Sequence, residues 1–527
     1  MAIELIEQQG SRAQPTQELF PVGGLNVDLP STELNEAESP SLKNIMFHRY
    51  SARSRPGLSL MGSNGLPVTG IPVGLFSYTK LDQTRYFVLM TTSELYKFDS
   101  VGQTWSSIKG SVDISCISTD FASAAFFPTT TTDTLIMTNG SDVIIKWNGS
   151  GNAAALTCPY KAKIVSPYRD YLLLINCEVS GTWIPQRVIW GDIGQPEVFT
   201  GGTSGQYDII SGGSNLIAAE KLRGVVYLYT EESIVSFWWV GGQQVFRWEE
   251  VVPGIGLAGK RTVGDFGDFH ILLGWENVLL FDGTQHLQRL ADGKVQEDLI
   301  GNINYDYIDN AFSIVDRKLG MYSLFVPEGS SQWPTARWVY NHRQGLWTRY
   351  DYDLFYSLLD DNDETAGFCV PAHYKDFTGL TWEQAEGAWT AWTARRWRDR
   401  DVSKDAPRIA FASNTKNVYE ENEIALDDVG TAIDNDYQTK DFQVGSYTRT
   451  IKLEFEAIGT TVDISYSTDE GNSWTSLETV TLDAADYNRY EVFLDTFGSR
   501  LRFRFRNIST TGWFELRKYR FWAIPRK

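Results

Sequence analysis

The chain carries few of the residue patterns that mark an enzyme. It contains no HExxH, GxSxG, CxxC or Walker-type phosphate loop, and its five histidines are scattered without a recognisable ligand spacing. The acidic run at 360–364 offers the clustered carboxylates that calcium favours, but it lacks the glycine of an EF-hand loop, so a solvated turn is the preferred interpretation. We predict no catalytic residue, no bound metal and no cofactor.

The four cysteines are Cys116, Cys158, Cys177 and Cys369. Their positions show neither paired metal-ligand spacing nor a dense disulfide framework. We predict that they are buried free thiols, because an unpaired cysteine usually behaves as a small apolar side chain.

The sharpest short motif is the run STDEGNSW at 467–474. It matches the Asp box, S-x-D-x-G-x-S/T-W, a hairpin turn that recurs in the blades of sialidases. Its expected role is structural: Asp469 accepts hydrogen bonds within the turn, Gly471 takes a positive φ, and Trp474 packs beneath the hairpin. The motif occurs once, outside the repeated region of the chain, and we expect it to connect two strands of the C-terminal domain.

A repeated strand-hairpin pattern forms the scaffold of the chain. Its copies begin close to Tyr86, Thr134, Tyr171, Val225, Phe269 and Met321. The average interval of about 47 residues is typical of a β-propeller. In the second copy, Asn139 and Gly140 separate two apolar runs and predict a tight hairpin, since both residues tolerate a positive φ. The copies differ widely in their letters, so the sequence leaves six or seven blades open.

Three regions follow from this pattern in an all-β chain. Residues 1–70 have little periodicity and several prolines, which indicates an extended N-terminal arm that ends in a first strand. Residues 71–422 hold the β-propeller. Residues 436–527 alternate apolar and charged side chains, which predicts a C-terminal antiparallel β-sandwich with one buried face and one wet face.

Composition limits the function classes. The formal net charge of −19 argues against general electrostatic attraction to nucleic acid. Taken alone, the negative net charge is best explained as surface charge that keeps a protein soluble. A channel for DNA would also benefit from negative walls, because such walls do not bind phosphate. No run of about 18 apolar residues and no signal peptide is present, so we expect a soluble protein made in a cytoplasm, without a membrane anchor.

A segment at 380–400, inserted in the propeller, is rich in tryptophan and arginine. Trp382, Trp389 and Trp392 stand at spacings of seven and three, as on one helical face. Arg395, Arg396 and Trp397 follow. We interpret the segment as a contact with a blade or a protein partner, with a channel gate as one form of that role; stacking on single-stranded bases is the less favoured alternative.

Residues 22–57 contain an ordered series of short motifs: VGGLN, DLP, LNEAE, LKNI and RSRPG. This series resembles the opening of the tail hub and nozzle proteins of short-tailed bacteriophages. Those proteins commonly begin with Gly-Gly-Leu/Ile-Asn, a nearby proline, an acidic stretch before Leu-x-Asn, and an Arg-Pro-Gly strand that opens the first blade. The matching residues are Gly23, Gly24, Leu25, Asn26, Pro30, Leu42, Asn44, Arg55, Pro56 and Gly57.

Physically, these residue types suit docking better than catalysis. Glycines permit a sharp turn, prolines keep the chain extended, and leucines anchor on a surface. We therefore interpret the segment as a docking arm. The alternative is a plain N-terminal strand that closes the propeller ring.

The resemblance implies a structural virion protein of the phage tail, assembled in the host cytoplasm. Similar proteins form a hexameric ring below the portal and adaptor, continue and gate the channel for genomic double-stranded DNA, and hold fibres or spikes. The partners implied are further copies of the chain, the adaptor and portal proteins, and a tail fibre or spike. The rival classes are a sialidase-like or other glycan-cleaving propeller enzyme and a carbohydrate-binding propeller.

Overall fold

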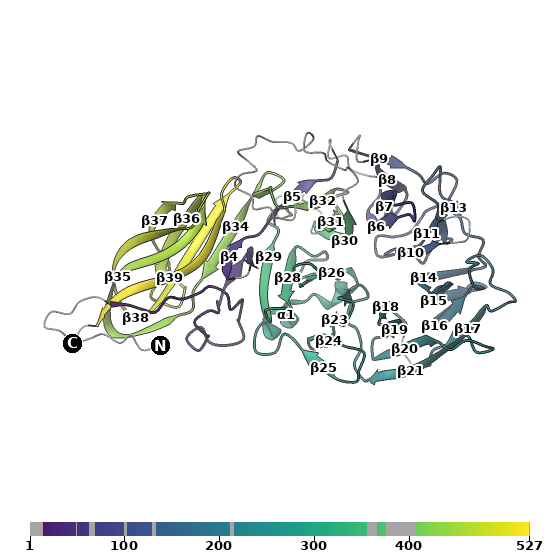
Figure 1. The fold of residues 1–527 in the computed structure, drawn as a ribbon, viewed down its shortest axis with the longest axis horizontal. Coiled ribbons are helices and arrows are strands. Elements are labelled where there is room, and N and C mark those ends of the chain that lie inside the picture. Colours follow the sequence, from purple (N-terminus) through teal and green to yellow (C-terminus); the bar gives the residue numbers. More distant parts are fainter. Residues whose placement is uncertain are drawn as a thin grey trace.

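The protein is an all-β molecule with a ring of sheets beside a sandwich (Figure 1). The computed structural model describes residues 14–48, 50–62, 69–99, 103–128, 133–210, 215–355, 366–375 and 407–525. Within these ranges the helices are α1 (Gln296–Asn302) and the 3-10 helix η1 (Tyr305–Asn310). Both lie between two blades of the ring.

Six separate four-stranded antiparallel sheets form the first six blades. Blades 1 to 3 consist of β6 (Pro72–Thr79), β7 (Arg85–Thr91), β8 (Leu95–Asp99) and β9 (Thr104–Ser107); β10 (Ser123–Pro128), β11 (Asp133–Thr138), β12 (Ile145–Trp147) and β13 (Ala154–Ala155); β14 (Tyr160–Tyr168), β15 (Tyr171–Val179), β16 (Thr182–Trp190) and β17 (Gly205–Asp208). Blades 4 to 6 consist of β18 (Ala218–Leu222), β19 (Val225–Tyr229), β20 (Ser233–Trp239) and β21 (Phe246–Pro253); β22 (Gly264–Asp265), β23 (His270–Leu273), β24 (Val278–Phe281) and β25 (Leu287–Arg289); β26 (Phe312–Asp316), β27 (Met321–Val326), β28 (Ala336–Asn341) and β29 (Leu346–Asp351).

A seventh four-stranded unit completes the ring. It consists of β30 (Phe368–Lys375), β31 (Pro407–Ser413), β32 (Val418–Asn422) and β5 (Gly57–Leu60), which pairs antiparallel with β32. The first strand of each blade contacts the first strand of the next, and β30 contacts both β26 and β6. The ring therefore consists of seven blades, and the N-terminal strand β5 closes it.

The β-propeller prediction is confirmed, because the six repeat starts coincide with the second strands of blades 1 to 6. In blade 2 the tight hairpin predicted at Asn139 and Gly140 is wrong, because residues 139–144 form a longer loop between β11 and β12. Gly140 has the expected positive φ, of 83°, while Asn139 instead accepts hydrogen bonds from the backbone N–H groups of Ser141 and Asp142. The seventh blade left no repeat in the sequence because its strands come from two distant segments, one of them in the arm.

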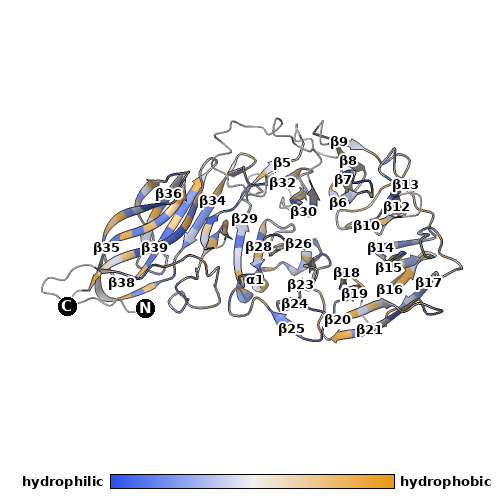
Figure 2. Cartoon of the chain, in the orientation of Figure 1, coloured by the Kyte–Doolittle hydropathy of each residue, from blue (hydrophilic) through white to orange (hydrophobic). Residues whose placement is uncertain are grey.

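The C-terminal sandwich is built on two long strands, β35 (Phe442–Gly459) and β38 (Asn488–Ser509). One sheet runs β3 (Ile45–His48), β4 (Ser51–Ser54), β39 (Phe514–Pro525), β35 and the first half of β38, and β1 (Gln14–Pro15) pairs with β39. The other contains β2 (Leu42–Lys43), β34 (Thr431–Gln438), the second half of β38, β36 (Thr461–Ser467) and β37 (Thr475–Thr481). Polar and apolar residues alternate along these strands (Figure 2), as the sequence predicts for an antiparallel sandwich.

The two parts share one hydrophobic core. A single buried cluster contains Leu25 and Ile45 of the N-terminal segment, Trp347 of blade 6, and Phe455 and Phe503 of the sandwich. The short strand β33 (Asp427–Asp428) pairs with both β5 and β34 and so links the seventh blade to the sandwich. The N-terminal segment is thus packed between propeller and sandwich.

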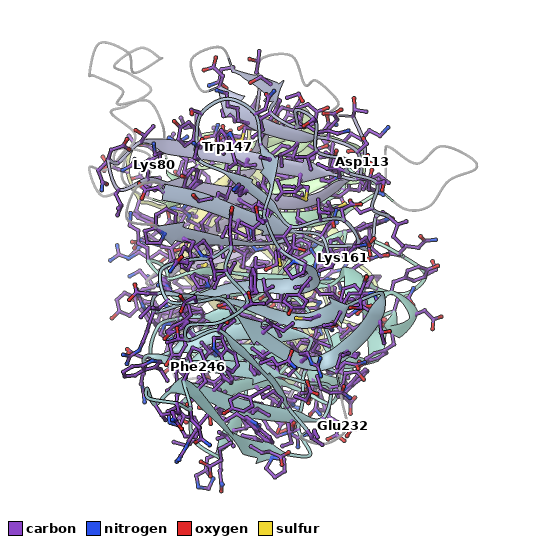
Figure 3. The ribbon with its side chains drawn as sticks, turned by 90° about the vertical axis from the view of Figure 1, so that its right-hand side faces the viewer. Lys80, Asp113, Trp147, Lys161, Glu232 and Phe246 are labelled. Carbon is purple, nitrogen blue, oxygen red and sulfur yellow. The ribbon has the colours of Figure 1, made fainter. Side chains whose placement is uncertain are left out.

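The loops of blades 1 to 6 divide between two faces of the ring, since successive antiparallel strands turn at alternate ends. One face, the 1–2 face, carries the loops that join first to second and third to fourth strands. The other, the 2–3 face, carries the loops that join second to third strands and one blade to the next. Figure 3 shows Lys80 near one edge of the propeller, and Asp113 and Lys161 near the other.

Candidate functional site

The glycine pair that opens the arm series packs against blade 6. Gly24 has a φ of 77°, and a Cβ there would lie 2.7 Å from Leu346 Cβ. The backbone N–H of Leu25 donates to the Trp347 carbonyl oxygen at 2.7 Å. The Asn26 side chain donates to buried Glu38, which Lys294 also contacts. These motif residues hold the segment on its own propeller.

Asn44 and Arg55 form a joint between the propeller and the sandwich. Asn44 adopts a φ of 58°, and its Oδ1 accepts hydrogen bonds from Arg55 Nε at 2.8 Å and from the Asp351 backbone N–H at 2.9 Å. Its amide nitrogen donates to the Asp434 carbonyl oxygen at 3.0 Å. One asparagine thus connects the arm, the end of β29 and the sandwich strand β34.

All five N–H donors of Arg55 are used in this joint. Besides Asn44, its guanidinium binds both carboxylate oxygens of Asp428, at 3.0 and 2.5 Å, and the carbonyl oxygens of Pro56 and Asp351, at 3.0 and 3.1 Å. Burial lowers the pKa of Arg55, but the Asp428 carboxylate outweighs burial and holds that pKa above its ordinary value. Arg55 is only 3% exposed. At the joint, Arg55 and Asp428 therefore form a buried ion pair in which every N–H donor of Arg55 has an acceptor.

In this structure the arm series lies largely inside its own chain, and docking on a partner stays a prediction. Seven of the ten arm residues are buried inside the chain: Gly24, Leu25, Asn26, Leu42, Asn44, Arg55 and Gly57. They are not available to a partner in this structure. Gly23 and Pro56 are half-buried, and Pro30 is exposed. The alternative role, a strand that closes the ring, is the one that β5 performs.

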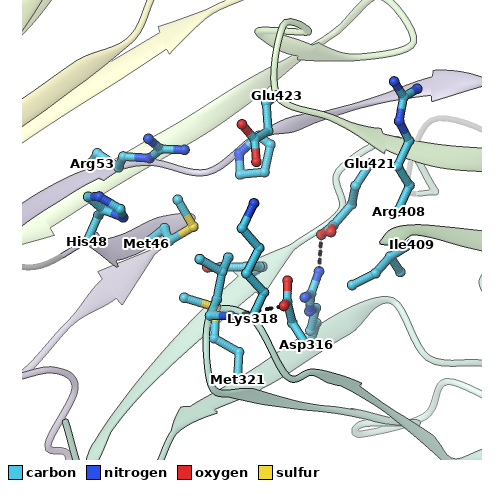
Figure 4. Close-up of a pocket in the computed structure, with 14 residues that line it drawn as sticks. Met46, His48, Arg53, Asp316, Lys318, Met321, Arg408, Ile409, Glu421 and Glu423 are labelled. Atoms are coloured by element: carbon cyan, nitrogen blue, oxygen red, sulfur yellow. Dashed lines mark hydrogen bonds and ion pairs between the residues drawn. The ribbon is translucent and has the colours of Figure 1, made fainter. Parts of the chain in front are cut away.

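A cavity of about 80 Å³ lies beside the joint, between β4, blade 6 and the seventh blade (Figure 4). Lys318 extends into it toward Glu423, and Arg408 lies at one side. At its base Arg337 forms a buried ion pair with Glu421. A space of this size holds only a few waters, and its mixed charges select neither anions nor cations.

The Asp box forms the turn that its sequence predicts, between β36 and β37 of the sandwich. Asp469 accepts hydrogen bonds from the Ser473 hydroxyl and backbone N–H at 2.6 and 2.9 Å. These bonds lower the pKa of Asp469 to about 2. Gly471 has a φ of 88°, and Trp474 lies half-buried below it. The motif serves the turn of a hairpin remote from the propeller channel.

The channel side of blades 4 and 5 contains titratable residues that the sequence did not single out. Glu220 on β18 lies deep between the two blades with part of its side chain in contact with solvent, and its carboxyl has no hydrogen-bond partner among the described residues. Burial and the charge of Asp265 raise the pKa of Glu220 to about 7. Asp265 on β22 is ion-paired with Arg317 at 2.5 Å.

His270 stabilises the wall beside these carboxyls. Its Nδ1 lies 2.6 Å from the Tyr229 hydroxyl and its Nε2 lies 3.1 Å from the Lys221 carbonyl oxygen. A carbonyl oxygen only accepts, so Nε2 carries the proton and Tyr229 donates to Nδ1. Burial lowers the pKa of His270, which keeps the ring neutral.

A larger cavity, of about 440 Å³, is lined by Asp265, by β26 residues including Ser313 and by His373 of β30. It follows the first strands of blades 5 to 7. Glu220 is not among the residues that line this cavity. A carboxyl that holds a proton near neutral pH, in the field of a charged carboxylate, is a candidate general acid. No motif marked this pair, because Glu220 and Asp265 are adjacent only after the blades pack.

Two sequence interpretations concern residues outside the described ranges. The tryptophan- and arginine-rich segment at 380–400, with Trp382, Trp389, Trp392, Arg395, Arg396 and Trp397, falls there, as does the acidic run at 360–364. Among the described residues, no group of three or more His, Cys, Asp or Glu side chains is placed to hold a metal ion.

The prediction that the four cysteines are free thiols is confirmed. All four are free; Cys116, Cys177 and Cys369 are buried and Cys158 is half-buried. Burial raises the pKa of Cys116 to about 11, so this thiol stays protonated.

In the described part of the chain, no helix has the length and apolar character needed to cross a membrane.

Comparison with known proteins gives likenesses in structure only. No family model and no curated protein sequence matches the chain. An exo-β-1,3-galactanase from Phanerochaete chrysosporium, solved with galactose, aligns at 9% identity with a TM-score of 0.27, covering 89% of this chain and 100% of that one. A mutant family 29 carbohydrate-binding module complexed with cellulohexaose aligns at 14% identity with a TM-score of 0.15, covering 17% of this chain and 69% of that one.

Proposed function

We propose that the chain is a structural subunit of the ring-shaped hub or nozzle of a short bacteriophage tail, rather than an enzyme. The observation that carries the proposal is the ordered series at 22–57, which resembles the opening of such proteins. In this role the subunits extend and gate the DNA channel below the portal and adaptor, and they hold fibres or spikes.

The joint supports a mechanical role. A subunit in the wall of a channel has to transmit load between its parts without bending at the connection. Here the series residues Asn44 and Arg55 connect propeller and sandwich through buried hydrogen bonds, and the two parts share one core. The net charge of −19 also suits a wall along which DNA passes without binding.

Electron microscopy of the purified protein, alone and mixed with portal-containing tail particles, tests the proposal. The expected result is a ring with the protein added to the tail end below the portal. A protein that remains a monomer and never associates with such particles would refute it.

The carboxyls in the channel favour one second candidate, a glycan-cleaving propeller enzyme. Glu220 would act as the proton donor and Asp265 as the partner carboxylate. The test is hydrolysis of a broad panel of aryl glycosides and oligosaccharides by wild type and Glu220→Gln. Activity that the substitution abolishes supports this candidate, and an inactive wild-type protein eliminates it.

A further inference from the structure

Exposed aromatic side chains lie in opposite electrostatic settings on the two faces of the propeller, at and beside blade 4. On the 2–3 face, Trp275 and Tyr305 are stacked with ring centres 6.1 Å apart and are 46% and 39% exposed. Around them lie the exposed carboxylates of Glu231, Glu232 and Asp306, with Ile255 41% exposed nearby. We name these six residues the acidic patch.

Backbone contacts make the acidic patch continuous. The Trp275 indole N–H donates to the Glu231 carbonyl oxygen at 3.1 Å, and the Tyr305 hydroxyl donates to the Trp275 carbonyl oxygen at 3.4 Å. Gly256, next to Ile255, lies directly against the backbone of Glu231 and Glu232. The polar atoms of both rings are thus engaged internally, while the ring faces stay open.

None of the three carboxylates is neutralised. Within the described part of the chain, Glu231, Glu232 and Asp306 form no ion pair, whereas the nearby Glu276 and Asp309 are paired with Arg289 and Lys260. An aromatic pair rimmed by unpaired carboxylates suits a cationic protein surface, because guanidinium groups bind both the ring faces and the carboxylates.

The other end of blade 4, on the 1–2 face, carries the complementary chemistry. Trp239 and Val240 are 37% and 38% exposed, and the Arg169 guanidinium lies 4.4 Å from the centre of the Trp239 ring. Arg223 and Arg247 are exposed beside them. We name these five residues the basic patch.

The basic patch is also continuous, and its guanidinium groups are exposed. The Tyr168 hydroxyl contacts both the Trp239 backbone N–H and the Gly224 carbonyl oxygen, which brings the loops of blades 3 and 4 together. Among the described residues, the three arginines of the patch form no ion pair. The same region holds the exposed carboxylates of Asp170 and Asp268 and the half-buried carboxylate of Asp282, which interacts electrostatically with Arg223.

The strand β20 separates the two patches. Glu232 directly precedes β20 and Val240 directly follows it, so seven residues span about 23 Å between the patches. Figure 3 shows Glu232 and Phe246, the latter next to Arg247, at opposite edges of the propeller. A contact between patches on two copies therefore joins different surfaces, which is the condition for a ring or an open chain of subunits.

We propose that the acidic patch of one copy of this chain binds the basic patch of the next copy. This inference deepens the proposed function and rests on it, since it names the surfaces that join neighbouring subunits. Trp275, Tyr305 and Trp239 supply the apolar anchors of the contact, and the charges set its direction.

A charge-swap experiment tests the proposal. Two double variants are prepared in the full chain, Glu231→Arg with Glu232→Arg, and Arg169→Glu with Arg247→Glu. Each alone is expected to weaken self-association by about 100-fold in dissociation constant, measured by mass photometry and sedimentation velocity, because like charges then face each other. An equimolar mixture of the two is expected to associate again, since swapped charges face each other.

The matched control reverses two exposed sandwich carboxylates, Glu478→Arg with Asp486→Arg, and is expected to associate like wild type. Wild-type copies that stay monomeric, or swapped variants that associate unchanged, would overturn the inference. If rings form on tail particles while both swaps assemble normally, the interface fails and the proposed function stands. If the swaps behave as expected but the oligomer never joins a tail, the interface stands and the proposed function fails.

Discussion

Removal of the Arg55 guanidinium is the most direct perturbation of the joint between propeller and sandwich. Arg55→Met deletes five hydrogen bonds and leaves Asp428, which is 2% exposed, as an unpaired buried charge. Breaking a buried ion pair in this way costs about 3–5 kcal/mol. Arg55→Lys keeps the charge but has three donors in place of a planar fork, and we expect a loss of about 2–3 kcal/mol.

The assay is thermal and urea unfolding followed by tryptophan fluorescence. A chain with two parts need not unfold in one step, so the comparison uses the first transition of each variant. The matched control is Arg449→Met, since Arg449 and its partner Asp495 form a similar pair at 2.7 Å but are 45% and 59% exposed. Exposed pairs contribute less than about 1 kcal/mol.

A double variant separates the pair from the rest of the joint. Arg55→Met combined with Asp428→Leu removes both charges and should be more stable than Arg55→Met alone, because no unpaired carboxylate remains. If Arg55→Met unfolds within about 1 kcal/mol of wild type, like the Arg449 control, the buried pair does not hold the joint and the reasoning fails.

Three further outcomes are expected. The pKa of Glu220 is about 7 in the folded protein against 4.5 ordinarily, so its stabilising contribution is complete below about pH 4.5 and is lost as the pH rises through about 7. At 1.36 kcal/mol per unit the loss is at most about 3 kcal/mol, and Glu220→Gln should flatten the melting temperature between about pH 5 and 8; an unchanged slope would contradict this. Gly57→Ala places a Cβ against the Asp427 carbonyl oxygen and should cost about 2–4 kcal/mol, with faster amide exchange confined at first to β5 and β32; equal exchange in all blades would show that β5 does not act as the closing strand. Asp469→Ala should speed exchange of the Ser473 amide more than that of the Gly471 amide, which donates to Ser467; an unaffected Ser473 amide would show that Asp469 does not maintain the turn.

The parts of the fold that depend on short-range order were predictable. The Asp box is decided by residues within a few positions, since a positive φ and local hydrogen bonds are properties of the turn itself. At Asn139 and Gly140 only the positive φ of Gly140 was predictable, because the length of the loop at 139–144 depends on where β12 pairs. The six repeat starts were found because each hairpin carries its own alternation of apolar and polar residues. The sequence left six or seven blades open because the seventh blade carries no repeat of its own: its fourth strand, β5, precedes β32 by more than 350 residues.

The candidate sites depended on long-range packing. The arm series was visible in the letters, yet the sequence did not show that Arg55 meets Asp428, 373 positions away, and so the residues interpreted as a docking arm became an internal joint. Glu220 looks like any other acidic residue until blade 5 brings Asp265 beside it and removes most of its water. The acidic and basic patches likewise combine loops from several blades.

The sequence by itself determined the all-β class, the hairpin repeat, the terminal sandwich and the Asp box turn, because periodicity and turn chemistry act between neighbours along the chain. Only the tertiary structure decided how the ring closes, what the arm residues contact and which charged groups are buried. Those features depend on burial and on electrostatic fields between segments far apart in sequence, and a string of residue types does not contain these distances.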